Sequence, residues 1–173
     1  RECCAEASEL GVCTGAYFNC PGQIVVSGDA AAVEKCCEAA KAKGAKRAMM
    51  LPVSAPFHCA LLKGAGEKLE KELLNVEVHD MKIPVITNVT ADYVASKDDI
   101  KPLLVKQVSN SVLWEDSIRR MLKDGVDTFI EIGPGKALSG FMRKIDKEAR
   151  CFNVEDMKSL EAALNGYRSE RGL

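Results

Sequence analysis

The chain has 173 residues, with 24 Lys and Arg side chains against 25 Asp and Glu and a net charge of -1. Hydrophobic residues make up 47%, which is typical of a globular protein and excludes a disordered one. This balance leaves no basic field for a phosphate backbone and no long apolar run, so neither nucleic acid nor a membrane is expected as a partner. The chain begins Arg1-Glu2-Cys3-Cys4, without Met or a signal-peptide pattern, so we expect a fragment or a processed chain.

Residues 12–53 have the pattern of strand, helix and strand, and they follow the end of a helix. Residues 1–10 are expected to form the end of a helix that stops at Gly11. Residues 23–27 are β-rich and follow a Cys-Pro-Gly turn. Asp29 is a natural N-cap for a helix that ends before Gly44, and residues 47–53 are expected to form another strand. This order corresponds to half of a split β-α-β unit.

Helices and strands alternate in the remainder of the chain. Helices are predicted at 59–75, 98–108, 114–123, 136–147 and 157–164, and strands at 83–89, 127–132 and 151–154. The polar tail 165–173 is expected to be frayed. The alternation indicates an α/β protein with a largely parallel sheet.

The eight cysteines include no pair with C-x-x-C spacing, which excludes a zinc ribbon and a thioredoxin-like motif. The chain is too large and too rich in aliphatic residues to need disulfides for stability. We therefore expect reduced thiols that act as small hydrophobic side chains in a cytoplasmic protein, with no metal site.

Of the two histidines, His58 has the more informative position. It follows a predicted strand and precedes a helix, which is the edge where α/β sheets form their sites. Taken alone, such a residue is structural slightly more often than catalytic. Cys59 is a rival nucleophile, but neighbours in sequence rarely present both side chains to one reacting atom. His79 lies in a polar stretch and is expected to be exposed, and no serine has the Gly-x-Ser-x-Gly pattern of a nucleophile elbow.

A glycine-rich turn, Gly133-Pro134-Gly135-Lys136, follows a predicted strand and opens a helix. It departs from the P-loop and the dinucleotide-binding patterns at Ala137 and Leu138. A tight strand-to-helix turn is the favoured interpretation, although the N-terminus of the following helix could attract an anion weakly.

Five segments in a fixed order carry a family resemblance: NCPGQIVVSG (19–28), KGAKR (43–47), LPVSAPFHCAL (51–61), IPVITNV (83–89) and EIGPGKAL (131–138). Together they closely resemble the C-terminal half of the malonyl-CoA:acyl carrier protein transacylases of fatty-acid synthesis. The resemblance covers residues 1 to about 164. It implies an α/β fold with part of a ferredoxin-like small subdomain at 1–52 and part of an α/β-hydrolase-like large subdomain at 53–173.

In that family a serine on a Gly-His-Ser-x-Gly elbow attacks the malonyl thioester, and a histidine takes the proton of the serine. His58 resembles this base, and Gln107 matches a residue whose backbone carbonyl orients it. Asn19 matches an asparagine near the catalytic pair, and Phe57 matches a position linked to the choice of acyl group. The resemblance implies malonyl-CoA and acyl carrier protein as partners and no cofactor.

The family's nucleophilic serine, the arginine that pairs with the malonate carboxylate and the glutamine of the oxyanion hole lie upstream of the matched region. We therefore expect the parent protein to be a transacylase, and this chain to be inactive without the missing N-terminal half. An alternative is a non-catalytic module that docks the acidic carrier protein through Lys41, Lys43, Lys46 and Arg47. A third alternative is a nucleotide-binding domain that uses the turn at 133–135.

Overall fold

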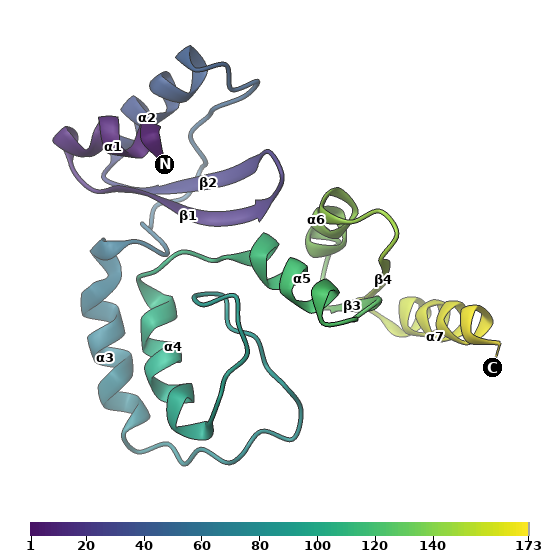
Figure 1. The fold of residues 1–173 in the computed structure, drawn as a ribbon. Coiled ribbons are helices and arrows are strands. Elements are labelled where there is room, and N and C mark those ends of the chain that lie inside the picture. Colours follow the sequence, from purple (N-terminus) through teal and green to yellow (C-terminus); the bar gives the residue numbers. More distant parts are fainter. Residues whose placement is uncertain (173) are drawn as a thin grey trace. The chain divides into compact units, whose positions relative to one another are not determined.

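The protein is described here by a computed structural model that covers residues 1–172, apart from the side chains of residues 170 and 171. The chain forms two compact units, Arg1–Ser117 and Ile118–Leu173, and each contains one two-stranded sheet (Figure 1). The division falls within helix α5 (Trp114–Lys123).

The first unit opens with a helix, a short 3-10 turn, a β-hairpin and a second helix. These elements are α1 (Glu2–Ala7), η1 (Ser8–Leu10), β1 (Cys13–Cys20), β2 (Gln23–Gly28) and α2 (Ala30–Ala42). The hairpin is antiparallel and turns at Pro21-Gly22, where Gly22 has a φ of 76° that glycine adopts without strain. α1 packs against α2, and buried Cys4, Ala7 and Cys36 form the core between them.

The rest of the first unit consists of two helices and a long loop. η2 (Ala60–Leu62) leads into α3 (Lys63–Leu73), and η3 (Lys97–Asp99) leads into α4 (Ile100–Val108). α3 packs against α4, and Gly66 is buried where α3 meets the backbone of Val105. A capping box between Ser96 and Asp99 fixes the start of the second helical segment.

The second unit contains a β-α-β arrangement followed by a helix. β3 (Thr128–Ile132) and β4 (Arg150–Val154) are parallel neighbours, and α6 (Ala137–Ile145) connects them, as a parallel pair requires. α6 and α7 (Met157–Arg171) both pack against β4, where Met142 and Ala163 are buried. Asp156 caps α7, and hydrogen bonds from Ser159 lower the pKa of its carboxyl group.

Several predictions about strands are wrong. Residues 13–20 form β1, which was not predicted, whereas residues 47–53 are irregular and 83–89 contain only an isolated bridge at Ile86. The largely parallel sheet is also wrong, because one of the two strand pairs is antiparallel. The tail is not frayed from residue 165, since α7 continues to Arg171; Leu173 lies outside the described residues.

The two segments wrongly predicted as strands expose large apolar side chains. Val53 is 64% exposed and Ile83 is 73% exposed, and Met49, Met50, Leu51 and Val85 are also exposed. β-Propensity stabilises a strand only when a neighbouring strand shares its hydrogen bonds, and within residues 1–172 these segments join no sheet; the second has only the short pairing of residues 85–87 with 92–94 around the Ile86 bridge. Their composition is that of buried strands, yet these apolar side chains are exposed.

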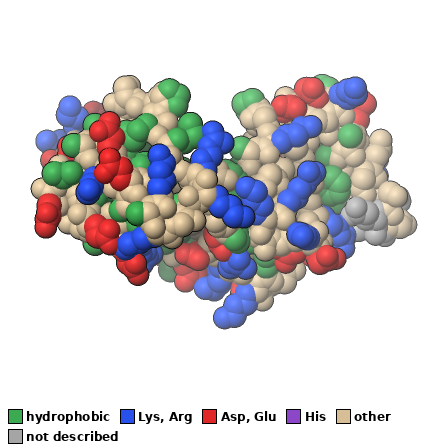
Figure 2. Space-filling model, turned by 90° about the horizontal axis from the view of Figure 1, so that it is seen from above, with side chains coloured by type: hydrophobic (Ala, Val, Ile, Leu, Met, Phe, Trp, Pro, Cys, Tyr) green, Lys and Arg blue, Asp and Glu red, His purple; other side chains and the backbone are tan. Residues whose placement is uncertain are grey.

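The surface has a mixed character. Acidic, basic and hydrophobic side chains are interspersed on the face drawn in Figure 2. Within residues 1–172, no helix has both the length and the apolar character needed to cross a membrane.

Candidate active site

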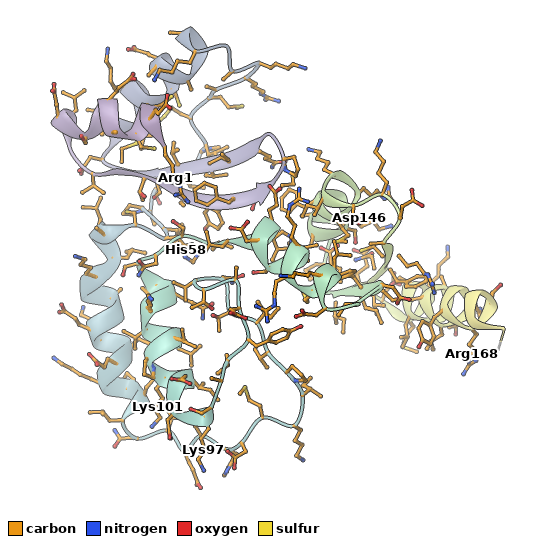
Figure 3. All side chains as sticks on the ribbon, viewed as in Figure 1. Arg1, His58, Lys97, Lys101, Asp146 and Arg168 are labelled. Atoms are coloured by element: carbon orange, nitrogen blue, oxygen red, sulfur yellow. The ribbon has the colours of Figure 1, made fainter. Side chains whose placement is uncertain are left out.

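His58 lies in the loop that precedes η2, with its backbone in the left-handed region at a φ of 56° (Figure 3). A residue other than glycine is uncommon there, and such conformations cluster at functional sites. The prediction that His58 follows a strand is wrong, because residues 51–57 form no strand. The side chain is half-buried.

The Nδ1 atom of His58 faces two backbone carbonyl oxygens. It lies 2.9 Å from the oxygen of Gln107 and 3.1 Å from that of Asn110. Because carbonyl oxygens only accept hydrogen bonds, Nδ1 must carry the proton of the neutral ring. Nε2 then holds a free lone pair, and no hydrogen bond occupies it within residues 1–172. The expected contact with Gln107 is present, and the ring is set to accept a proton at Nε2.

Gln107 lies in the last turn of α4, and Asn110 lies two residues beyond the end of that helix. The last carbonyls of a helix lack partners inside the helix, so they are available to another donor. The side chain of Asn110 donates to the backbone oxygen of Lys106 at 2.7 Å, which ties the segment after α4 to the last turn of the helix. The negative end of the helix dipole therefore faces His58, and it stabilises positive charge that develops on the ring when Nε2 takes a proton.

Gln107 also holds the neighbouring loop. Its side-chain Oε1 accepts a hydrogen bond from the backbone N–H of Asn88 at 3.0 Å. The carbonyl of Asn88 in turn accepts from the N–H of Leu113 at 2.8 Å. Gln107 thus links the loop over residues 83–93 to the same helix end that orients the histidine.

Strand β1 contacts the site through Tyr17, a residue that the sequence analysis missed. The rings of Tyr17 and His58 meet edge to face, with centroids 4.9 Å apart and planes at 77°. Val112 lies beside β1, since the N–H of Phe18 donates to its oxygen at 2.9 Å and its own N–H donates to Ala16 at 2.8 Å. Asn110 was missed as well. The Tyr17 contact depends on the placement of an unpredicted strand, and the Asn110 contact uses a backbone carbonyl just past α4 that no sequence signal marks.

Within the described residues, no hydrogen bond, ion pair or ring contact joins the side chains of Asn19 and Phe57 to that of His58. Asn19 is the extra residue of a β-bulge, because the ladder pairs Phe18 with Ile24 and then Cys20 with Gln23. A bulge re-aims the side chain that it carries, and bulges are frequent beside active sites. Phe57 is 49% exposed, immediately before His58.

Cys59 is not placed to act as a nucleophile. Its side chain is only 1% exposed, and its Sγ donates to the oxygen of Pro56 at 3.2 Å. His79 is exposed as expected, with its Nδ1 3.8 Å from the carboxylate of Glu77. His58 is therefore the candidate base.

The amides at the glycine-rich turn are already used by carboxylates of the chain. Gly135 N–H donates to Glu155 at 2.9 Å, and the N–H groups of Leu138 and Ser139 donate to Glu131 at 3.0 and 2.8 Å. Burial raises the pKa of Glu131, but hydrogen bonds from Ser139 and Leu138 outweigh it and lower the pKa below its usual value. The position that a phosphate would take at the start of α6 is filled by Glu131, which argues against nucleotide binding.

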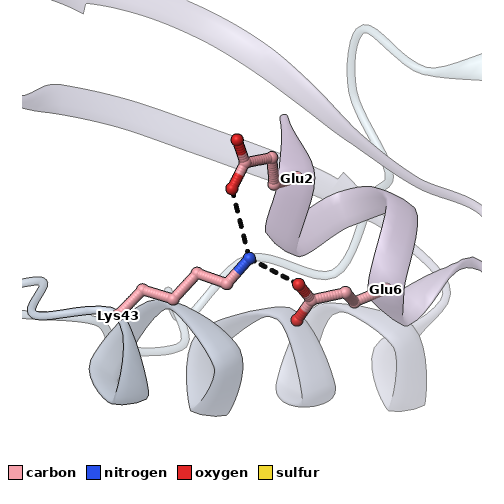
Figure 4. Close-up of polar contacts among 3 residues, drawn as sticks. All are labelled: Glu2, Glu6 and Lys43. Carbon is pink, nitrogen blue, oxygen red and sulfur yellow. Dashed lines mark hydrogen bonds and ion pairs between the residues drawn. The ribbon is translucent and has the colours of Figure 1, made fainter.

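Lys43 is one of the four basic residues of the docking-module alternative, and it forms ion pairs within the chain. Lys43 pairs with Glu2 at 3.2 Å and also with Glu6 (Figure 4). Hydrogen bonds to Glu6 and Glu2 raise the pKa of Lys43, so the ammonium group stabilises the contact between α1 and α2. Its charge is used within the molecule, which weakens the docking-module alternative.

Comparison with known proteins identifies the family. No protein-family model matches the chain. The malonyl CoA-acyl carrier protein transacylase of Bacillus subtilis is 46% identical over 155 residues, which are 90% of this chain and 49% of that protein. The crystal structure of the transacylase from Clostridium perfringens is 48% identical, with a TM-score of 0.94 over 98% of this chain and 54% of that one.

The chain belongs to the malonyl CoA-acyl carrier protein transacylase family. It spans about half the length of the relatives that it matches. A second similar structure holds a type II polyketide synthase acyl carrier protein in complex with its malonyl-transacylase; it is 38% identical, with a TM-score of 0.92 over 95% of this chain and 53% of that one. The family that the sequence motifs predicted is thus confirmed.

Proposed function

We propose that this chain supplies the general base of a malonyl-CoA:acyl carrier protein transacylase, and that the serine nucleophile comes from the other half of the enzyme. The observation that supports this role best is the pair of carbonyls at Nδ1 of His58, which leaves Nε2 unprotonated and free. A base must have its lone pair within reach of the proton that it removes, and this arrangement provides one.

In the proposed first step, Nε2 of His58 accepts the hydroxyl proton of the serine as the serine oxygen attacks the thioester carbon of malonyl-CoA. The carbon–sulfur bond then breaks, and the imidazolium returns the proton to the leaving CoA sulfur. A malonyl ester of the serine remains.

In the second step, the pantetheine thiol of the carrier protein gives its proton to Nε2 and attacks the ester carbon. The serine leaves and recovers the proton, so the enzyme returns to its starting state. The carbonyls of Gln107 and Asn110 keep the ring in one tautomer throughout, although a carbonyl stabilises the imidazolium less than a carboxylate would. No cofactor is needed for this sequence of steps.

We assign Asn19 and Phe57 to substrate binding. Asn19 lies on the same strand as Tyr17, whose ring touches His58, and the bulge gives its side chain an orientation outside the regular ladder. Phe57 is exposed next to the base, where an apolar side chain can contact the acyl group. The carrier-protein complex of the similar structure supports an acyl carrier protein as the acceptor.

The exposed apolar segments support the proposal that a further polypeptide segment completes the fold. Parallel sheets are normally covered on both faces, yet Ile130 and Ile132 of the β3–β4 pair are 54% and 83% exposed. Residues 47–53 and 83–89 have strand-like composition but belong to neither sheet. We propose that the N-terminal half of the enzyme pairs with these elements, and that the chain is inactive without it.

The proposed division places a ferredoxin-like part at residues 1–52 and an α/β-hydrolase-like part at 53–173. The hairpin with its two helices fits the first, and the β3–α6–β4 unit fits the second. Eight free cysteines fit a reducing compartment, so we place the enzyme in the cytoplasm.

A fusion protein tests the proposed role of His58. The N-terminal half of the Bacillus subtilis relative is joined to this chain, and transfer of malonyl from CoA to a carrier protein is followed by the mass of the carrier protein. We expect activity in the fusion and none in the chain alone. His58→Ala should lower the rate by about 100- to 10,000-fold, which is the usual contribution of a general base.

His79→Ala is the matched control, because His79 is exposed and distant in sequence from the site. It should leave the rate unchanged. Full activity of the His58→Ala fusion would remove the assignment of the base, and activity of the chain alone would remove the need for a second half.

A further inference from the structure

Three cysteine sulfurs meet in the first unit, apart from the candidate active site. Cys4 comes from α1, Cys13 from β1 and Cys36 from α2, and their Sγ atoms all lie within 4.8 Å of one another. The Sγ atoms of Cys4 and Cys36 are 3.7 Å apart. Cys4 and Cys36 are buried, and Cys13 is half-buried. Separate elements, rather than a local sequence motif, bring these ligands together.

The spacing suits a single ion bound to three thiolates. Sulfur ligands lie about 2.3 Å from a bound soft ion, which places three sulfurs about 4 Å apart around a planar trigonal centre and closer together around a pyramidal one such as trivalent arsenic. The observed separation of Cys4 and Cys36 is close to this value, and Cys13 needs only a small adjustment. The fold therefore holds the three ligands near their bound geometry.

Two of the three thiols have raised pKa values. Burial, followed by hydrogen bonding to Cys4, raises the pKa of Cys13 far above its usual value and that of Cys36 to about 11. Such thiols are poor nucleophiles, so a redox or catalytic role is disfavoured. Among residues 1–172, no fourth Cys, His, Asp or Glu belongs to the group; Cys3 packs against the same core but lies outside it. A bound ion must accept exactly these three sulfurs and leave little net charge in the interior.

We propose that Cys4, Cys13 and Cys36 form a three-thiolate site for a soft three-coordinate ion, with trivalent arsenic as the ligand that matches it best. Arsenous acid, As(OH)3, exchanges its three hydroxyl groups for three sulfurs. Three S–H bonds and three As–O bonds break, three As–S bonds form, and three waters leave. Arsenic stays trivalent, and the product carries no net charge. Zn²⁺ on the same ligands would leave one buried negative charge and would lack a fourth ligand.

Solvent can reach the cluster from one side. A cavity of about 250 Å³ is lined by Cys4, Thr14, Gly15, Phe18, Ser111 and Arg1, the last of which is labelled in Figure 3. An uncharged solute such as arsenous acid can enter through this cavity and reach Cys4 first. Half-exposed Cys13 provides a second point of access.

Native mass spectrometry of the full chain in a phosphine reductant tests the proposal, with arsenite as the probe and Zn²⁺ in a parallel arm. We expect one arsenic per chain with the loss of three hydrogens, a product one water lighter than an adduct that uses only two thiols. Arsenite should bind more tightly than Zn²⁺. Replacing a residue that only hydrogen-bonds to a metal ligand lowers metal affinity by about 10- to 100-fold. Cys13→Ala removes a ligand itself, so it should weaken arsenite binding by at least about 100-fold.

Cys37→Ala is the matched control, because Cys37 follows Cys36 on α2 but lies outside the group. It should bind arsenite like the unchanged chain. A two-thiol mass on the unchanged chain, loss of the adduct in Cys37→Ala, or tighter binding of Zn²⁺ would overturn the proposal. These outcomes do not require Cys13→Ala to fold, and circular dichroism shows whether that variant can be compared.

Discussion

The carboxylate of Glu131 holds the start of α6, and its replacement by glutamine should loosen that helix end. Oε1 of Glu131 accepts from the N–H of Leu138 at 3.0 Å, while Oε2 accepts from both the N–H and the hydroxyl of Ser139, at 2.8 and 2.5 Å. Glutamine keeps only one accepting oxygen and turns an N–H₂ group toward a donor. It also removes the negative charge from the positive end of the helix.

The size of the effect follows from these bonds. Hydrogen bonds to a charged group contribute about 1.5–3 kcal/mol and neutral ones about 0.5–1.5 kcal/mol, so Glu131→Gln should cost about 2 kcal/mol. This corresponds to about a 30-fold loss of protection against hydrogen exchange at the amides of Leu138 and Ser139, measured by NMR. Glu148→Gln is the control, because Glu148 is exposed on the same unit. It should change protection little.

The effect should depend on pH with a defined sign. The pKa of Glu131 in the folded chain lies below its ordinary value of 4.5, so its contribution to stability is complete above that value and is lost as the pH falls through the folded pKa. The difference between the unchanged chain and Glu131→Gln should be equal at pH 7 and pH 5.5 and should shrink at lower pH. Unchanged protection at Leu138 and Ser139, or a difference that persists to pH 2, would refute the reasoning.

Two further substitutions test the hairpin and the helix end beside His58, both by urea denaturation. A Cβ at Gly28 would lie 1.8 Å from the carbonyl oxygen of Val12, so Gly28→Ala should destabilise the chain by at least about 2 kcal/mol. Gly22 has open space around it, so the control Gly22→Ala should cost only about 1 kcal/mol. Equal effects of the two substitutions would contradict the packing at Gly28. Gln107→Ala leaves the N–H of Asn88 without its acceptor and should lower the free energy of unfolding by about 1–3 kcal/mol. Gln107→Glu keeps an acceptor and should retain most of that stability. An unchanged free energy of unfolding in Gln107→Ala would show that this bond contributes nothing.

Helices were predictable from the sequence because their signals are local. Asp29 and Gly44 bracket α2 as expected, and Gly125 follows α5. Apolar spacing located α3, and β3 and β4 lie where strands were predicted. The C-terminal helix extends further than predicted. Its polar residues continue the helical hydrogen bonds, but they show no periodic apolar pattern from which a helix could be predicted.

Strands were less predictable, because their stability depends on partners distant in sequence. Residues 83–89 have strand composition and an early proline, but only Ile86 bridges to another residue, Tyr93. β1 was missed because Gly15, Ala16 and Asn19 give it a weak β-pattern; its partner β2 and the segment at Val112 supply the hydrogen bonds that the composition does not reveal.

The candidate site was predictable only in part. Sequence motifs selected His58 and matched Gln107 as its backbone partner, and the two are in contact. The second carbonyl, from Asn110, and the ring of Tyr17 became visible only with the positions of the end of α4 and of β1. The backbone carbonyl that accepts a given hydrogen bond cannot be identified from sequence, since every residue carries one.

The tautomer of His58 tests the central claim most directly. A His79→Gln chain contains one histidine, and ¹⁵N chemical shifts of its ring distinguish a protonated from an unprotonated nitrogen in the neutral form. The two carbonyls at Nδ1 predict a proton on Nδ1 and a free lone pair on Nε2. A neutral ring protonated mainly on Nε2 would contradict the account, because His58 could then not accept a proton at the position that the structure leaves open.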